Sequence, residues 1–544
     1  MMSIDQLVVA VEAQPTAVVV SAAIGALFSA HLLLRLTQKK PKSKLVVPKS
    51  SLPILKNTLD LMFFNRHRLY DWVADECEAA GGKPWVQAIV GGAPSVVVST
   101  PELFEDILKT QYESFHKGDT SYFNDVFGNG ILAADGEAWA FHRRTASTMF
   151  SSQMMKDVMC EAVREKAEVL CKALRTYESR GDPVSFKTVI MHFTSDVFGE
   201  IGFGIDLKCL ENGVEGKQGN EFVEAFSTST AILFQRLLQP RWLWKLKRYL
   251  NIGTEKTNKE KHEVIDKFIY RIINESIAKK KTESESGAPS SSLSDGASAP
   301  KDLISLFLSS LGQDDESLKG TGYDSELQLI RDTVLNFIFA GKDTTSHSMS
   351  FFIVMMNRYP EVLKKIRDEL QAKLPRNSSG EFQIPTMEDL PQLVYLEAAI
   401  RENLRLNPSA PGLRKLAKKD LVLCDGTFIA KDGHVGLSIY ASGRMKCNWG
   451  EDALEFKPER WIDPETGKLS VVSPFKLTAF GGGRRNCIGS KFAMMEIKCT
   501  LAVLLSQFDF KTLEDPWTMT YVAALTMGVK GPMMVNVTSI EASA

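Results

Sequence analysis

The sequence FGGGRRNCIG, at residues 480–489, places one cysteine in a loop rich in glycine and arginine. The stretch that follows, 491–505, has the pattern of a helix. Backbone amides, the positive end of that helix and two arginines would each lower the pKa of the Cys487 thiol. The loop therefore predicts a thiolate that acts as a ligand or as a nucleophile.

Cys487 has four possible roles: an inert buried thiol, a nucleophile, a zinc ligand or a haem ligand. A buried, inert thiol is common, but it has no need of four glycines and two arginines around it. A nucleophile needs a general base, and the spacing identifies none. A zinc site needs further ligands, and His142, His347 and His434 form no such pattern. A single thiolate that is the sole protein ligand of a haem iron fits best.

The loop resembles the haem-binding signature of the cytochrome P450 family, FxxGxRxCxG. Its five defined positions are occupied by Phe480, Gly483, Arg485, Cys487 and Gly489. The resemblance implies haem b (iron protoporphyrin IX) as the cofactor and Cys487 as the ligand of the iron. It also implies that the glycines let backbone and porphyrin approach closely, that Phe480 covers the loop and that Arg485 binds a propionate.

An ExxR motif supports the same resemblance. Glu402 and Arg405 match it, and their i, i+3 spacing puts both side chains on one face of a helix. Arg460 resembles the arginine that completes this buried set in the family. Taken alone, Glu402 and Arg405 would be a surface ion pair of small worth.

Trp139 and Arg143 resemble the family's WxxxR pair, in which the indole and the guanidinium meet the haem propionates. Taken alone, this pair would be a helix surface. Arg414 is a further candidate for a propionate, although its alignment with the family is ambiguous.

A long helix is predicted to begin after Ser325. Residues 325–328 fit a capping box, and apolar residues recur for about 33 residues, or about 50 Å, until Tyr359 and Pro360. Its middle, AGKDTT at 340–345, contains a glycine and poor helix formers, which suggests a functional site.

The AGKDTT stretch resembles the family's oxygen-activation motif. That resemblance implies that Asp343 and Thr344 are an acid–alcohol pair that relays protons beside dioxygen, and that Gly341 leaves room above the iron. The alternative is a threonine pair that bonds back to carbonyls and bends the helix.

The fold class predicted is mainly α with small β-sheets (α+β). The resemblance implies the cytochrome P450 fold, with the long helix crossing over the haem. Strands are expected at 88–90 and 94–98, paired as a hairpin, and near 421–424 and 533–537. Residues 56–544 are expected to form a single catalytic haem domain with a disordered, serine-rich insertion at 281–300.

The N-terminus predicts a membrane anchor. An apolar run at 17–34 is followed by five basic residues, so we expect a short lumenal segment at 1–16, a signal-anchor transmembrane helix at 17–36 and a basic, proline-rich neck at 37–55. A cleavable signal peptide is the alternative, but its basic residues should precede the apolar run. The expected location is the endoplasmic reticulum membrane, single-pass, with the catalytic domain in the cytosol.

Composition limits the other partners. The chain has 65 Lys+Arg and 66 Asp+Glu, a net charge of −1, which argues against a nucleic-acid partner. Its eight cysteines form no CxxC pair, as expected of reduced thiols.

The expected reaction is insertion of one oxygen atom of O2 into a C–H bond of a lipophilic substrate. Because no GxGxxG turn is present for NADPH or flavin, the electrons should come from NADPH through a separate NADPH–cytochrome P450 reductase, with cytochrome b5 as a second candidate donor. A basic docking face is expected from Arg144, Arg484, Lys491 and Lys498. A haem-thiolate isomerase, which usually departs from the Asp–Thr motif, and a haem sensor remain the alternatives.

Residues 128–139 and the AGKDTT motif resemble the branch of the family that hydroxylates fatty acids at or near the terminal carbon. Sterols, terpenoids and alkanes remain alternative substrates. The resemblance implies these pocket residues, each of which could equally be core: Phe123, Phe127, Phe337, Phe339, Ala340, Thr345, Ala524 and Leu525.

Overall fold

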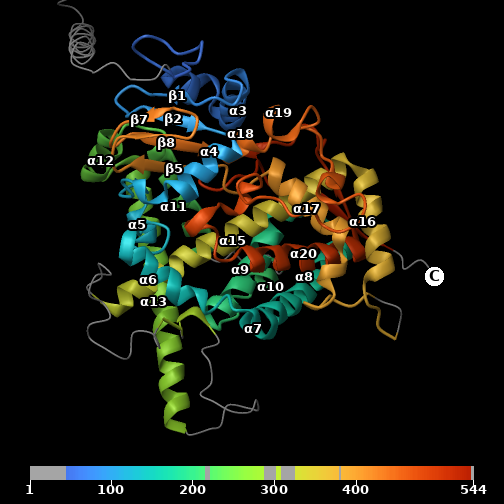
Figure 1. The fold of residues 1–544 in the computed structure, drawn as a ribbon. Coiled ribbons are helices and arrows are strands. Elements are labelled where there is room, and N and C mark those ends of the chain that lie inside the picture. Colours follow the sequence, from blue (N-terminus) through green and yellow to red (C-terminus); the bar gives the residue numbers. More distant parts are fainter. Residues whose placement is uncertain are drawn as a thin grey trace, which may run out of the picture.

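The computed structural model describes residues 45–214, 221–286, 302–304, 306–307, 325–378 and 382–540. Helices form most of it, and the largest sheet lies to one side (Figure 1). The predicted lumenal segment and transmembrane helix, and residues 37–44 of the neck, lie outside the described residues. Within the described ranges, no helix combines the length and the apolar character that crossing a bilayer requires.

The helices are α3 (Leu69–Ala79), α4 (Pro101–Glu105), α5 (Asn124–Phe127), α6 (Gly136–Ser147), α7 (Ser152–Met154), α8 (Cys160–Arg180), α9 (Phe186–Phe203), α10 (Cys209–Val214), α11 (Glu221–Leu237), α12 (Arg241–Tyr249), α13 (Gly253–Ser286), α15 (Glu326–Arg358), α16 (Pro360–Lys373), α17 (Val394–Leu406), α18 (Ile439–Ser442), α19 (Lys446–Trp449) and α20 (Ser490–Gln507).

The largest sheet has the strand order β1-β2-β8-β5-β3, with β2 and β8 parallel and the other pairs antiparallel. The smaller sheets are β4-β12-β9, β6-β7 and β10-β11. The strands are β1 (Trp85–Gln87), β2 (Ser95–Val98), β3 (Phe115–His116), β4 (Val184–Ser185), β5 (Gly412–Ala417), β6 (Leu421–Val422), β7 (Phe428–Ile429), β8 (His434–Ser438), β9 (Phe508–Thr512), β10 (Tyr521–Val522), β11 (Gly528–Val529) and β12 (Met534–Ser539).

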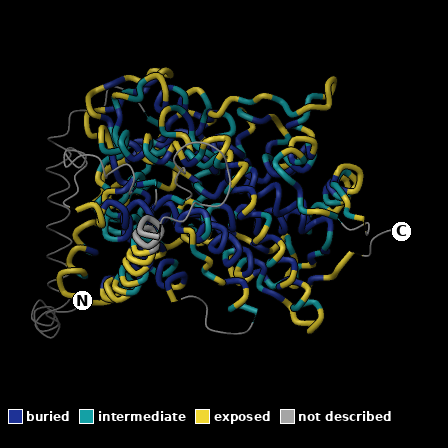
Figure 2. The backbone as a smooth tube through the Cα atoms, turned by 90° about the horizontal axis from the view of Figure 1, so that it is seen from below, coloured by how far each residue is buried: buried dark blue, intermediate teal, exposed yellow. Residues whose placement is uncertain are grey.

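The predicted long helix is α15, which has 33 residues and begins where the capping box indicates. The Ser325 hydroxyl accepts a hydrogen bond from the Gln328 amide at 3.3 Å. The helix crosses the middle of the molecule beside α9 and α20 (Figure 1). Residues 329–338 and 348–356 are buried throughout, because neighbouring helices cover every face of these two segments. Buried backbone fills the same central region in Figure 2.

Two local predictions are wrong. Residues 281–286 belong to the end of α13, so the predicted insertion does not start at residue 281; positions 287–300 lie outside the described residues. The first strand of the predicted hairpin is residues 85–87 rather than 88–90, because Trp85 pairs with Val97 and is itself buried. Burial of this tryptophan sets the register.

Candidate active site

The Cys487 loop is held by its own backbone. The Cys487 amide donates to the Phe480 carbonyl at 2.7 Å. Gly483 has φ +67°, and a Cβ there would collide with the Leu108 carbonyl, so only glycine fits this turn. Cys487 is exposed, yet the surrounding protein desolvates its sulfur. The residue is thus accessible, although the surrounding protein removes much of the water from its thiol.

The expected low pKa of Cys487 is wrong for this structure. Burial raises the pKa, and the Gly489 amide and Arg143 only oppose that rise. The two arginines of the loop contribute little because they point away: Arg484 pairs with Glu113 at 2.7 Å and Arg485 pairs with Asp135. Neither guanidinium faces the sulfur.

Three predicted cofactor residues gather around this loop. Arg143, on α6, donates to the Asn486 carbonyl at 2.6 Å and to the Asn486 side-chain oxygen at 2.9 Å. Arg485 lies over the Trp139 ring, 4.4 Å from its centre, and donates to the Tyr112 hydroxyl at 3.0 Å. The tertiary structure thus brings α6 and the cysteine loop together.

Lys117 and Lys415, which no sequence motif identified, lie near Arg485. Burial, and then the charge of Arg485, lower the pKa of Lys117 to about 7 and that of Lys415 to about 8. Within the described chain these three cations face one carboxylate, Asp135. With all three cations protonated the cluster has an excess of two positive charges, but at neutral pH Lys117 is only about half protonated. The two propionates of a haem would supply negative charge that keeps both lysines protonated. The charge of the site fits the cofactor.

Arg414 does not lie in this cluster. It is exposed on β5, whereas its neighbour Lys415 is buried. Successive residues of a strand point to opposite faces of the sheet, so Lys415, not Arg414, reaches the cations beside the cysteine loop. The ambiguous alignment left this one-residue choice open.

The middle of α15 shows the back-bonding that the sequence offered as the alternative for this motif. The Thr344 hydroxyl donates back to the Ala340 carbonyl at 2.6 Å, and the Asp343 carboxylate pairs with the adjacent Lys342. The Thr344 hydroxyl and the Asp343 carboxylate are therefore each bonded elsewhere and not to each other. Ala340 is exposed although the helix around it is buried, so this position faces accessible space.

The expected role of Gly341 is wrong. A Cβ at Gly341 would lie 2.6 Å from the Phe198 ring, so the missing side chain makes room for α9. Thr345 also points away from the predicted pocket. It forms a hydrogen bond with Glu496 on α20, and burial raises the pKa of that carboxyl to about 8. The face of a helix that meets a neighbour cannot be known from the motif alone.

Some predicted pocket residues do come together. The Phe127 ring lies 4.9 Å from Phe339 and 6.2 Å from Phe123, and Phe226 of α11 joins them at 6.4 Å from Phe339. Phe226 was not predicted, because the α11 sequence has no motif. Phe337 instead stacks on Phe150 at 6.2 Å.

Ala524 and Leu525 are half-buried in the turn between β10 and β11. The Tyr70 hydroxyl donates to the Ala524 carbonyl at 2.7 Å, which fixes this turn against α3.

The family can now be assigned. A cytochrome P450 family model matches residues 48–534. The chain belongs to the cytochrome P450 family. Similar proteins include cytochrome P450 86B1 of Arabidopsis thaliana, 33% identical over 89% of this chain and 84% of its own. Cytochrome P450 94B1 of Arabidopsis thaliana is 32% identical over 87% of this chain and 88% of its own, and CYP94D109 of Paris polyphylla is 32% identical over 82% and 86%.

This P450 is a haem monooxygenase that uses dioxygen and electrons from a redox partner. The basic face expected for that partner needs one correction. Arg144, Arg484 and Lys491 are exposed, but Lys498 is buried and pairs with Glu397 at 2.8 Å. Because α20 is covered on this side, Lys498 lies inside the protein.

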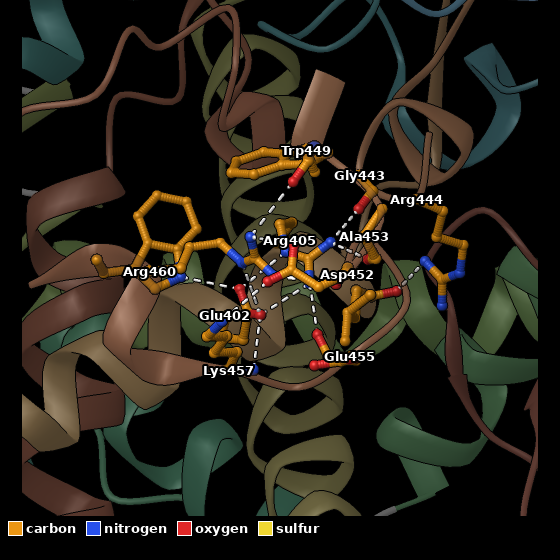
Figure 3. Close-up of polar contacts among 12 residues, drawn as sticks. Glu402, Arg405, Gly443, Arg444, Trp449, Asp452, Ala453, Glu455, Lys457 and Arg460 are labelled. Carbon is orange, nitrogen blue, oxygen red and sulfur yellow. Dashed lines mark hydrogen bonds and ion pairs between the residues drawn. The ribbon is translucent and has the colours of Figure 1, made fainter. Parts of the chain in front are cut away.

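The predicted Glu402 set is assembled in this P450 (Figure 3). Glu402 and Arg405 are fully buried and form two bonds of 2.8 Å, and Arg460 donates to Glu402 at 3.2 Å. The Trp461 indole and the Lys457 amide also donate to Glu402, at 2.9 and 2.8 Å. A charge this deep is tolerated only because so many donors surround it.

Proposed function

We propose that this P450 hydroxylates fatty acids at or near the terminal carbon, with NADPH electrons delivered by a separate NADPH–cytochrome P450 reductase. Residues 128–139 and the AGKDTT motif carry the resemblance to that branch of the family. The apolar cluster of Phe123, Phe127 and Phe339 beside the accessible Ala340 supports an alkyl substrate.

In this proposal Cys487 is the ligand of haem b, and its position is the observation that carries the function. Arg143, Trp139 and Arg485 hold the propionate side of the haem, together with Lys117 and Lys415, whose excess charge the propionates would neutralise. Phe480, Gly483 and Gly489 keep the loop closed around the sulfur. When bound, the haem supplies the cleavage of dioxygen and the oxidation of the substrate.

Asp343 and Thr344 are proposed to hold and relay protons at the accessible middle of α15. Lys342 holds the Asp343 carboxylate next to the accessible middle of α15. The Thr344 hydroxyl has one proton to donate, and rotating it away from the Ala340 carbonyl would aim it into the site. Ser409 and Ser348 donate to the Thr344 carbonyl at 2.8 and 2.9 Å, which keeps the backbone in place during that rotation.

We also propose that the protein is anchored in the endoplasmic reticulum membrane by residues 17–36, with its catalytic domain in the cytosol. Seven exposed apolar residues lie between positions 46 and 64, soon after the proposed anchor, which supports contact with a bilayer. They are Val46, Val47, Leu52, Ile54, Leu55, Phe63 and Phe64. Arg144, Arg484 and Lys491 remain candidates for docking the reductase or cytochrome b5.

The ligand assignment is tested with Cys487→Ala. We expect the reduced protein under carbon monoxide to show the red-shifted Soret band of thiolate ligation, and the substitution to abolish that band. Cys447→Ala is the matched control, because Cys447 is also an exposed thiol but lies in another part of the fold. A normal band in Cys487→Ala would eliminate the assignment.

The substrate class is tested by incubating the membrane-bound protein with reductase, NADPH and a panel of fatty acids, sterols, terpenoids and alkanes. We expect hydroxylated fatty acids as the main products. Turnover of a sterol alone would contradict the proposal, and the absence of any product with every compound would favour a haem sensor.

A further inference from the structure

Arg414 lies on the face of the main sheet opposite the one that carries Lys415. Along β5 and β8 it stands opposite Gly436, and His434 is two residues from Gly436 on the same face. The opposite face carries Lys415, Val435 and Leu437, which are buried. Because Gly436 has no side chain, the guanidinium of Arg414 has room above the sheet.

The charge of Arg414 acts on two neighbours but pairs with no carboxylate of the described residues. Burial raises the pKa of Tyr122, and Arg414 opposes that rise. Burial lowers the pKa of His434, and Arg414 adds to that effect. An arginine whose charge reaches a phenol and an imidazole, and which has no carboxylate partner among the described residues, is suited to bind an anion from outside the protein.

A row of aromatic rings leads from Tyr122, on which the charge of Arg414 acts, to the middle of α15. The Tyr122 ring lies 4.2 Å from Phe123, which lies 6.2 Å from Phe127, which lies 4.9 Å from Phe339. Phe339 is followed by the accessible Ala340.

The same face of the sheet carries Val97, opposite Gly436 on β2. Val97 belongs to an apolar cluster against which Phe234 of α11 and Ala523, at the turn after β10, pack. Arg414 thus faces the side of the sheet where the segments of the expected pocket meet.

We propose that Arg414, assisted by the Tyr122 hydroxyl, binds the carboxylate of the fatty-acid substrate while the alkyl chain follows the phenylalanines towards Ala340. This inference rests on the proposed fatty-acid hydroxylation. It replaces the haem propionate, expected for Arg414 from the sequence, with the acid group of the substrate. A chain anchored at one end would present its far end to the oxygen, which explains a preference for terminal carbons.

The test uses the full-length protein with its haem. Arg414→Met keeps the length of the side chain and removes the charge, and Lys418→Met, on an exposed lysine just after β5, is the matched control. Binding of dodecanoic acid and of dodecan-1-ol is measured by the spectral shift that substrates induce, and haem content is measured in parallel. We expect Arg414→Met to weaken binding of the acid about ten- to a hundredfold and to change binding of the alcohol by less than about threefold. Arg414→Lys should restore part of the loss.

Equal weakening of acid and alcohol in Arg414→Met would overturn the inference, because it would indicate general damage to the pocket. Loss of haem in Arg414→Met, but not in Lys418→Met, would also overturn it and return Arg414 to a propionate. An unchanged preference for the acid in Arg414→Met would overturn the inference while leaving fatty-acid hydroxylation intact. Failure of the wild-type protein to bind any acid while it hydroxylates alkanes or sterols would instead refute the proposed function.

Discussion

Glu496 shows how a single residue can depart from its ordinary chemistry when a fold covers it. It belongs to α20 and is buried, and one of its carboxyl oxygens has no hydrogen-bond partner among the described residues. Burial raises its pKa to about 8, and the bond with Thr345 only opposes that rise. The carboxyl is therefore mostly protonated at neutral pH, directly behind the Asp343–Thr344 turn.

This carboxyl makes stability depend on pH. The folded state binds its proton up to about pH 8, whereas the unfolded chain releases it near the ordinary value of 4.5. Stability should therefore fall as the pH rises between these values. From pH 6 to pH 8, the free energy of unfolding of Glu496→Gln should rise by about 2 to 3 kcal/mol relative to that of the wild type, because glutamine has no proton to lose. Thermal unfolding at both pH values measures the gain.

Glu165→Gln is the control for this experiment, because Glu165 is exposed on α8. It should change the unfolding temperature by a similar small amount at both pH values. A Glu496→Gln difference that does not grow with pH would show that the buried carboxyl is ionised in the folded protein.

At the scale of an element, α17 is fixed by its buried charges. Arg405 donates to Glu402 and to three carbonyls outside the helix, those of Gly443, Ala453 and Glu455. Figure 3 shows Arg405 among these three residues. They belong to the segment between α18 and Trp461, which precedes the cysteine loop in the chain. The Arg405 guanidinium thus connects α17 to the segment that precedes the Cys487 loop in the chain.

Arg405→Lys should destabilise the protein, because an ammonium group has three donors at one point and cannot span four acceptors. We expect a loss of about 2 to 4 kcal/mol, seen as a lower unfolding temperature and a lower haem content after expression. Arg401→Lys, on the same helix, is the control. Its guanidinium is partly exposed and bonds mainly to Glu397, so about 1 kcal/mol or less is expected. Similar losses in both variants would contradict a special role for Arg405.

At the scale of the whole molecule, the two ends of the described chain are joined near the expected pocket. The Tyr521 hydroxyl donates to the Asp71 carboxylate at 3.0 Å and accepts from the Tyr70 amide at 3.0 Å. Tyr440 donates to the same carboxylate at 2.6 Å. Helix α3, the β10 strand and α18 therefore meet at one aspartate. Because Tyr70 also holds the Ala524 carbonyl, the turn that follows β10 is rigidly placed.

The sequence by itself determined the family, the cysteine loop, the capped long helix and the Glu402–Arg405–Arg460 set. The cysteine loop, the helix cap and the Glu402–Arg405 pair depend on short spacings, which local backbone geometry sets and a sequence displays directly. Arg460 was expected from the family resemblance, and the fold brings it to Glu402 from 58 positions away. The tertiary structure alone decided which side chains meet across the fold. It selected Lys117 and Lys415 in place of Arg414, buried Lys498, turned Thr345 towards Glu496 and used Gly341 to admit Phe198. Packing between distant segments decides which neighbour covers each face of an element. It therefore also decides which charged groups are desolvated.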